Sequence, residues 1–151
     1  MNHFEKLNRV IPSCFPHPTT ADEHGLVAVS DYIDNDLLLD AYTHGIFPWT
    51  DNPICWFSPA KRAVFSINDI KTPKKINNII AKNEFTVTFN KNFTEVITAC
   101  AKTHAKHGIW ITDRYIKAYS KFHKQGFAQS TEVWQNGKLV GGLYGVLINR
   151  M

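Results

Sequence analysis

Apolar residues recur along this chain with two different periods, and the changes of period divide it into elements. Spacings of three and four residues predict amphipathic helices, whereas alternation predicts strands. Helices are predicted over residues 34–45, 72–82, 92–107 and 113–126, and strands over 25–29, 63–67, 85–89, 109–111, 127–134 and 139–148. This mixture of the two patterns indicates an α+β fold class.

Residues with special capping or turn preferences support several of these boundaries. Asp34 is placed to cap a helix that Gly45 would end. Asn92 and Glu95, three residues apart, form a capping pair for the third helix. Asn136-Gly137 is typical of a two-residue hairpin turn, so the last two strands are expected to pair with each other.

Residues 45–59, G-I-F-P-W-T-D-N-P-I-C-W-F-S-P, follow neither period. Their three prolines argue against a regular helix or a central strand, because proline lacks the amide donor and fixes φ. We therefore predict an ordered loop. Its aromatic residues, Phe47, Trp49, Trp56 and Phe57, either pack into a core or line a pocket, and both readings stay open at this point.

The composition is that of a globular chain with a mild positive charge. With 151 residues and 44% apolar content, the chain can build the core of one domain, or of a small domain joined to part of another. The net charge of +4 favours phosphate-bearing partners, although an ordinary basic surface explains it equally well. Three cysteines without C-x-x-C spacing indicate a reducing cytoplasm. No apolar run approaches the ~18 residues that cross a bilayer, so export and membrane insertion are not expected.

The last predicted strand, residues 139–148, reaches almost to the final residue, Met151. A strand at the edge of a sheet exposes unpaired amide and carbonyl groups unless another segment packs there. From this pattern we expect a complete protein to carry further sequence beyond Met151.

Sequence motifs of nucleotide binding and of common hydrolases do not occur in this chain. G-G-L-Y-G lies inside a predicted strand instead of opening a helix, and neither G-x-S-x-G nor H-E-x-x-H is found. Cys100, His104 and His107 share one predicted helical face, but no carboxylate or fourth ligand is in register with them. No metal site is therefore expected.

The remaining candidates for chemistry are aromatic and basic side chains. Aromatic rings stack on nucleobases or apolar groups, and lysines meet phosphates. The candidate stacking residues are Tyr42, Trp49, Trp56, Trp110 and Trp134, and the candidate phosphate-facing residues are Lys74, Lys75 and Lys82. A solvated helix face is the alternative for the lysines. Glu132, on the predicted hairpin, lies either in such a pocket or on the solvated side of its strand.

Several of these stretches together carry a resemblance to a known family. The relevant motifs are L-L-L-D-A-Y-T-H-G-I-F-P-W at 37–49, W-F-S-P-A-K-R-A-V at 56–64, I-W-I-T at 109–112 and S-T-E-V-W-Q-N-G-K-L-V-G-G-L-Y-G-V at 130–146. In these motifs the chain resembles the bacterial leucyl/phenylalanyl-tRNA-protein transferases. The similarity runs over nearly the whole chain in the family's order.

The resemblance implies a fold and an activity. It implies a small N-terminal domain, residues 1–62, followed by an incomplete GNAT-like acyltransferase domain, residues 63–151. The family's reaction moves leucine or phenylalanine from charged tRNA to the N-terminal Lys or Arg of acceptor proteins, which marks them for degradation by the N-end rule. It implies no metal or nucleotide cofactor, no membrane partner, a cytoplasmic location and a monomer.

The resemblance also implies roles for particular residues. Trp49 and Leu143 would line an apolar pocket for the aminoacyl side chain, Tyr42 and Trp110 would stack near the terminal adenosine, and Lys74, Lys75 and Lys82 would face the acceptor stem. Glu132 joins the substrate-binding set. The catalytic groups of the family are expected beyond Met151, so a non-catalytic tRNA-binding or RNA-binding protein is the alternative. The family's G-G-D-L is here Ser30-Asp31-Tyr32-Ile33, a departure that concerns one turn.

Overall fold

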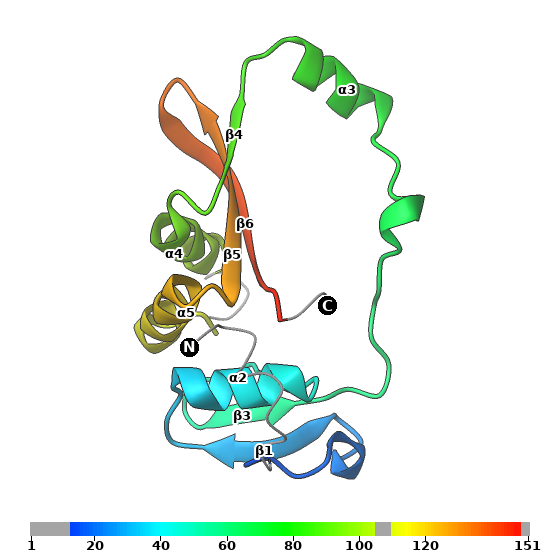
Figure 1. Cartoon of the computed structure of the whole chain (residues 1–151), viewed down its shortest axis with the longest axis vertical. Coiled ribbons are helices and arrows are strands. Elements are labelled where there is room, and N and C mark those ends of the chain that lie inside the picture. Colours follow the sequence, from blue (N-terminus) through cyan, green and yellow to red (C-terminus); the bar gives the residue numbers. More distant parts are fainter. Residues whose placement is uncertain (1–12, 105–109, 149–151) are drawn as a thin grey trace, which may run out of the picture.

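Two small antiparallel sheets and a long connecting arm make up the computed structural model, which describes residues 13–104 and 110–148 (Figure 1). The sheet nearer the N-terminus lies at one end of the molecule beside a single helix. The second sheet carries two helices on one of its faces. The predicted α+β class is thus confirmed, and none of the described helices combines the length and apolar character needed to cross a bilayer.

The N-terminal part contains three strands and one α-helix. They are β1 (Leu26–Ser30), α2 (Asn35–Thr43), β2 (Phe47–Pro48) and β3 (Ile54–Phe57), preceded by the short 3-10 helix η1 (Pro18–Thr20). The carboxylate of Asp34 caps α2 by accepting from the amide of Leu37 at 2.8 Å, and Gly45 follows the helix with φ of +73°. The predicted helix and its boundaries are confirmed.

Residues 45–59 are not one loop, and the prediction that they contain no central strand is wrong. β3 lies in the middle of its sheet, paired antiparallel with β1 on one side and β2 on the other. The prolines do not interrupt it, because Pro53 and Pro59 flank the strand and Pro48 lies on the edge strand β2. Ile54 and Trp56 are fully buried, so this part of the segment is core.

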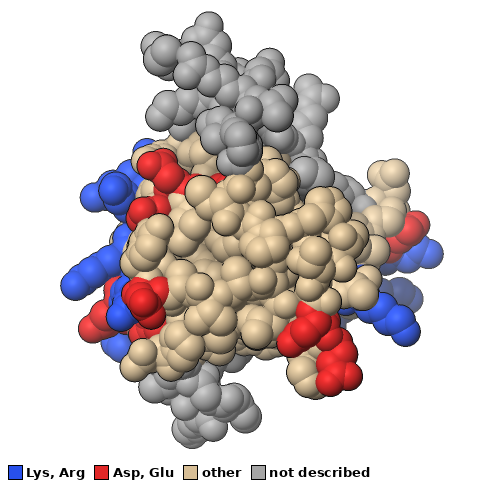
Figure 2. Space-filling view, turned by 90° about the horizontal axis from the view of Figure 1, so that it is seen from below, with Lys and Arg blue, Asp and Glu red and all other residues tan. Residues whose placement is uncertain are grey.

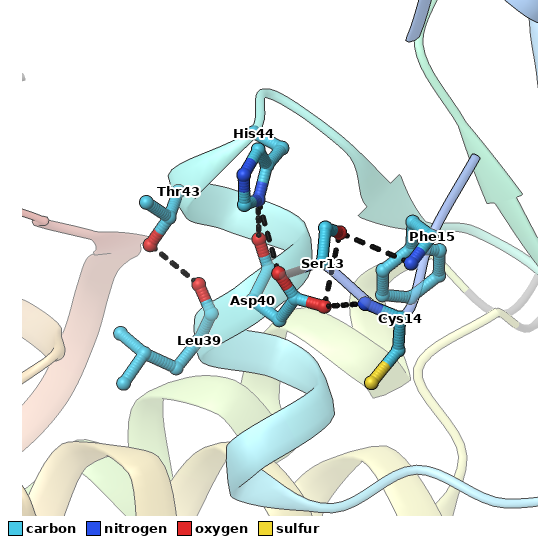
Figure 3. A network of polar contacts seen from close by, with 7 residues as sticks. All are labelled: Ser13, Cys14, Phe15, Leu39, Asp40, Thr43 and His44. Carbon is cyan, nitrogen blue, oxygen red and sulfur yellow. Dashed lines mark hydrogen bonds and ion pairs between the residues drawn. The ribbon is translucent and has the colours of Figure 1, made fainter. Parts of the chain in front are cut away.

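A network of polar contacts around Asp40 fastens the chain before β1 onto α2 (Figure 3). One carboxylate oxygen accepts from the amide of Cys14 at 2.7 Å and from the hydroxyl of Ser13 at 3.1 Å. The other lies 3.0 Å from Nδ1 of His44. Phe15, next in the chain, packs edge-on against Trp56 with ring centroids 4.8 Å apart. The contacts of Asp40 therefore hold the segment that carries Phe15 against α2.

The arm contains the 3-10 helix η2 (Ile67–Asp69) and α3 (Lys74–Ala81). The helix after Pro73 is confirmed, whereas the strand predicted over residues 63–67 is wrong. Val64 and Phe65 are 86% and 87% exposed, and no described strand pairs with their segment. A β-prone sequence without a pairing partner gains no ladder of hydrogen bonds, so it stays irregular.

The C-terminal part contains the second sheet and its two helices. Its elements are β4 (Thr86–Phe89), α4 (Phe93–His104), α5 (Asp113–Lys124), β5 (Ala128–Gln135) and β6 (Lys138–Val146), with the strand order β4-β5-β6. Asn136-Gly137 forms the predicted two-residue turn, with φ of +51° and +74°. Trp110 and Ile111 form no strand, and Ile109 lies outside the described residues.

Helices α4 and α5 cover only one face of the second sheet. Ser130, Glu132 and Tyr144 point to the covered side, whereas Phe89, Thr131 and Leu143 lie in register on the other. Leu143 is 71% exposed, and no described element covers it. Buried residues of the covered side join those of the first sheet in one core, which includes Leu38, Ile54, Tyr115 and Phe122.

Candidate functional site

A pocket of about 400 Å³ opens where α2, α5 and β6 meet. Four of its six lining residues are aromatic. The lining residues are Tyr42, Trp110, Tyr119, Tyr144, Gly145 and Val146. The predicted adenosine-stacking residues, Tyr42 and Trp110, therefore share one pocket although they lie 68 positions apart in the sequence.

The polar feature of this pocket is a pair of tyrosine hydroxyls. Oη of Tyr42 lies 2.6 Å from Oη of Tyr119, so one hydroxyl donates to the other and the second keeps a proton to donate elsewhere. Burial raises the pKa of Tyr42 to about 12, a rise that the bond to Tyr119 partly offsets. Burial also raises the pKa values of Tyr119 and Tyr144. At neutral pH these groups are hydrogen-bond donors and acceptors, not bases.

Helix α5 supports the pocket through Tyr115. The Tyr115 ring is fully buried, stacks on Tyr119 with centroids 6.1 Å apart and meets Trp110 edge-on at 5.9 Å. Both arrangements are favoured by the charge distribution of aromatic rings. Trp110 is consequently held by packing even though it belongs to an irregular segment.

Trp49 does not line this pocket. Its ring packs against Phe47 and Phe57, with centroids 6.1 and 6.0 Å apart, and the residue is 53% exposed. Arg62 lies over the Phe47 ring, 5.5 Å from its centroid, and donates to the Gly45 carbonyl. Leu143 is also outside the pocket, since it points away from Tyr144 on the uncovered face of the sheet.

Glu132 is completely buried, so the solvent-facing alternative for this residue is wrong. It does not line the pocket either. Its carboxylate accepts from the hydroxyls of Thr88 at 2.5 Å and Ser130 at 2.6 Å, and from the amides of Lys91 and Asn92 at 3.4 and 3.3 Å. Burial alone would raise the pKa of Glu132, but these four hydrogen bonds lower it below its usual value. The charged carboxylate thereby fixes the turn between β4 and α4.

Two tryptophans that are candidates for stacking make hydrogen bonds within the fold. Trp56 is fully buried and donates through Nε1 to Ser30, so its ring is closed to a base. Trp134 donates through Nε1 to Thr88, the residue that also donates to Glu132. The sequence also places Cys100, His104 and His107 on one helical face. Of these, His107 and the side chain of His104 lie outside the described part of the structure. Among the described residues no cluster of three metal-ligand side chains occurs.

The three candidate phosphate-facing lysines, Lys74, Lys75 and Lys82, are exposed on and just after α3. Figure 1 shows α3 at the end of the molecule opposite the first sheet. Figure 2, a view from the side of that sheet, shows charged side chains at the margins and few at the centre, so this face offers little to a phosphate backbone.

Tyr119 and Tyr144 also line the pocket, although the sequence pattern does not mark them as site residues. Helical spacing places Tyr119 on the apolar face of α5, which also describes an ordinary core residue. Strand alternation places Tyr144 on the same side as Glu132. Only the tertiary contact with Tyr42 gives the hydroxyl of Tyr119 its partner.

Comparison with known proteins gives the family. Sequence models described as leucyl/phenylalanyl-tRNA protein transferase and as its N-terminal domain match residues 64–151 and 33–60. The transferase of Lawsonia intracellularis is 47% identical over 144 residues, which are 92% of this chain and 63% of that protein. The transferase of Thermodesulfovibrio yellowstonii is 45% identical over 139 residues, 90% of this chain and 57% of that protein. The chain thus spans only part of the length of these relatives, and it belongs to the leucyl/phenylalanyl-tRNA-protein transferase family.

Proposed function

We propose that this chain carries the part of an aminoacyltransferase that binds the aminoacylated 3′ end of tRNA. The proposed reaction transfers leucine or phenylalanine to the N-terminal Lys or Arg of an acceptor protein. The names of the relatives support the reaction class. The observation that carries the binding step is the pocket of about 400 Å³ walled by Tyr42, Trp110 and Tyr119.

The pocket has suitable chemistry for a nucleoside. Its volume of about 400 Å³ lies in the range of small-molecule sites, which is roughly 300–1,000 Å³. A base stacked on an aromatic side chain gains about 1–3 kcal/mol. The free proton of the Tyr42 and Tyr119 pair supplies one directed hydrogen bond for a ribose or base oxygen or nitrogen.

Trp49 and Leu143 are proposed as apolar contacts for the leucyl or phenylalanyl side chain. Both expose large apolar surface in the described structure. Contacts of this kind distinguish side chains by about 1–3 kcal/mol per methylene-sized group. Lys74, Lys75 and Lys82 are proposed to meet phosphates of the acceptor stem, where each neutralised phosphate adds salt-dependent affinity.

A Trp110→Ala variant tests the binding proposal directly. The ligand is an amide-linked leucyl-adenosine, which cannot hydrolyse, and its affinity is measured by calorimetry. Loss of one stacking face, which contributes about 1–3 kcal/mol, lowers the affinity about five- to 150-fold. Tyr32→Phe is the control, because it removes an exposed hydroxyl outside the pocket. Equal affinities of Trp110→Ala and the wild type contradict the assignment.

A non-catalytic tRNA-binding role is the second candidate, and one observation favours it. The pocket residues in the described part of the chain offer tyrosine hydroxyls with raised pKa values, but no carboxylate or histidine. Aminolysis of an ester needs a deprotonated amine, which a base commonly provides. An assay for transfer of labelled leucine from leucyl-tRNA to a peptide with N-terminal arginine distinguishes the two functions. Transfer that depends on Trp110 supports the enzyme, and binding without transfer supports the non-catalytic role.

The same proposal covers location and organisation. The described cysteines, Cys14, Cys55 and Cys100, are all free thiols, which agrees with a reducing cytoplasm. We also propose that the chain acts as a monomer, and that the division into residues 1–62 and 63–151 corresponds to an N-terminal and a GNAT-like domain. Limited proteolysis tests the division, because cleavage is expected at the exposed residues Val64 and Phe65, just after the proposed boundary.

A further inference from the structure

One buried side chain, Tyr115, connects two parts of the proposed binding site. Its hydroxyl donates to the carbonyl oxygen of Thr50 at 2.6 Å. Its ring packs against Trp110 and Tyr119 of the pocket. Thr50 directly follows Trp49, so Tyr115 spans from the pocket wall to the neighbour of the proposed aminoacyl contact.

The loop between β2 and β3 keeps its own shape through internal hydrogen bonds. The amide of Trp49 donates to the carbonyl of Cys55 at 3.0 Å, and the amide of Cys55 donates to the Thr50 hydroxyl at 2.9 Å. The same hydroxyl donates to the carbonyl of Pro53 at 2.6 Å. These bonds hold the residues of the loop relative to one another, but they do not hold the loop against α5.

Two contacts hold the loop between β2 and β3 against the start of α5. One is the hydrogen bond from Tyr115 to Thr50. The other is the ion pair between Nε of Arg114 and Oδ1 of Asp51, 3.3 Å apart. Arg114 is partly exposed, so solvent screens the ion pair, whereas the Tyr115 hydroxyl acts from a fully buried ring. The Tyr115 bond is therefore the more rigid of the two.

We propose that Tyr115 is a positioning residue, which holds Trp49 at a fixed distance from the Trp110 pocket and thereby sets the preference for a large apolar aminoacyl side chain. The inference rests on the proposed function. A wall that shifts loses its contacts with the leucyl group, because dispersion contacts weaken steeply over fractions of an ångström. The nucleoside contacts stay, since the ring of Tyr115 and not its hydroxyl supports Trp110.

The test compares two amide-linked adenosines, one carrying leucine and one carrying glycine, by calorimetry. The wild type is expected to prefer the leucyl compound. Tyr115→Phe keeps the ring but removes the hydroxyl, and it lowers this preference about three- to tenfold, as loss of one hydrogen bond implies. Its affinity for the glycyl compound is unchanged. Tyr32→Phe, which removes an exposed hydroxyl elsewhere, leaves both affinities unchanged.

A second background separates positioning from a general structural role. In a Trp49→Ala chain, Tyr115→Phe has no further effect on the preference for the leucyl compound, because the Trp49 side chain that Tyr115 positions is already absent. If Tyr115→Phe lowers both affinities equally, or changes neither, the inference is overturned while the proposed function stands. If the wild type binds neither compound, the proposed function fails and the inference fails with it.

A variant in the loop covers the case in which Tyr115→Phe does not fold. Asp51→Asn weakens the ion pair to Arg114 and changes a side chain that is not part of the core. It is expected to lower the leucyl preference in the same direction and by a smaller factor. An unchanged preference in a folded Asp51→Asn chain overturns the inference.

Discussion

Nδ2 of Asn35 donates a 2.6 Å hydrogen bond to Oε1 of Gln125, which lies ninety positions later in the chain. Asn35 begins α2 and Gln125 follows the last residue of α5, so the bond joins the start of one helix to the end of the other. With the contact of Tyr42 and Tyr119 further along, it shows that the helices run antiparallel. The pocket depends on this packing.

Gln125→Ala is expected to reduce the free energy of unfolding. Asn35 is buried, and the variant leaves its amide group without its partner, which costs about 1–3 kcal/mol. Urea unfolding followed by circular dichroism measures the loss. Lys124→Ala, one residue earlier and exposed, should change the stability by less than about 0.5 kcal/mol. Equal stabilities of the two variants would show that the bond is not formed in solution.

Because the hydroxyls of Tyr42 and Tyr119 are paired, we expect the stability losses from removing each of them to be strongly non-additive. Tyr42→Phe leaves the buried hydroxyl of Tyr119 without a partner and should cost about 1–3 kcal/mol of stability. Removing both hydroxyls leaves no polar group unpaired, so the double variant should be less destabilised than the sum of the single variants. A double-mutant cycle measured by thermal unfolding gives the coupling, and simple additivity would contradict the pairing.

Because the pKa of Glu132 is lowered in the folded chain, we expect part of the free energy of unfolding to depend on pH. Its folded pKa is lowered, so its contribution is fully present above the unfolded value of about 4.3 and is lost as the pH falls towards the folded value. Glu132→Gln, which weakens the four hydrogen bonds, should cost about 1–3 kcal/mol at pH 7. The difference from the wild type should shrink below about pH 4.

Urea titrations between pH 3 and pH 7 measure this difference. Glu84→Gln provides the control, since Glu84 is an exposed glutamate just before β4. It should follow the wild type at every pH. A constant difference between Glu132→Gln and the wild type across the whole range would show that the carboxylate is not the titrating group.

Local rules predicted much of the fold because the deciding residues act on their neighbours. Asp34 caps α2 within three residues, and Asn136-Gly137 sets the hairpin between β5 and β6. β3 was missed because the number of prolines in residues 45–59 matters less than their positions at its ends. The strand expected near Val64 failed because strand formation needs a partner that the local sequence does not specify.

The candidate site was predictable only in part, for a related reason. Aromatic residue type and the family resemblance point to Tyr42, in a predicted helix, and to Trp110, in a predicted strand, and the structure brings them into one pocket. The periodicity of α5 places Tyr119 with the core residues. Its hydroxyl acquires a role only through its partner Tyr42 on another helix, which the periodicity does not reveal. Glu132 needs the same tertiary information, since three of its four donors lie about forty positions earlier in the chain, within residues 88–92.

Gly142 lies where α4 packs closely against β6. A Cβ atom at this position would lie 3.0 and 3.1 Å from the two Cγ atoms of Val96, and 3.2 Å from the Thr131 carbonyl oxygen. Gly142→Ala should therefore overpack the contact and cost about 1–3 kcal/mol. Gly145→Ala on the same strand meets no atom within 4 Å and should leave stability nearly unchanged. Thermal unfolding of both variants distinguishes close packing at Gly142 from a general intolerance of side chains in β6, which would lower both melting temperatures alike.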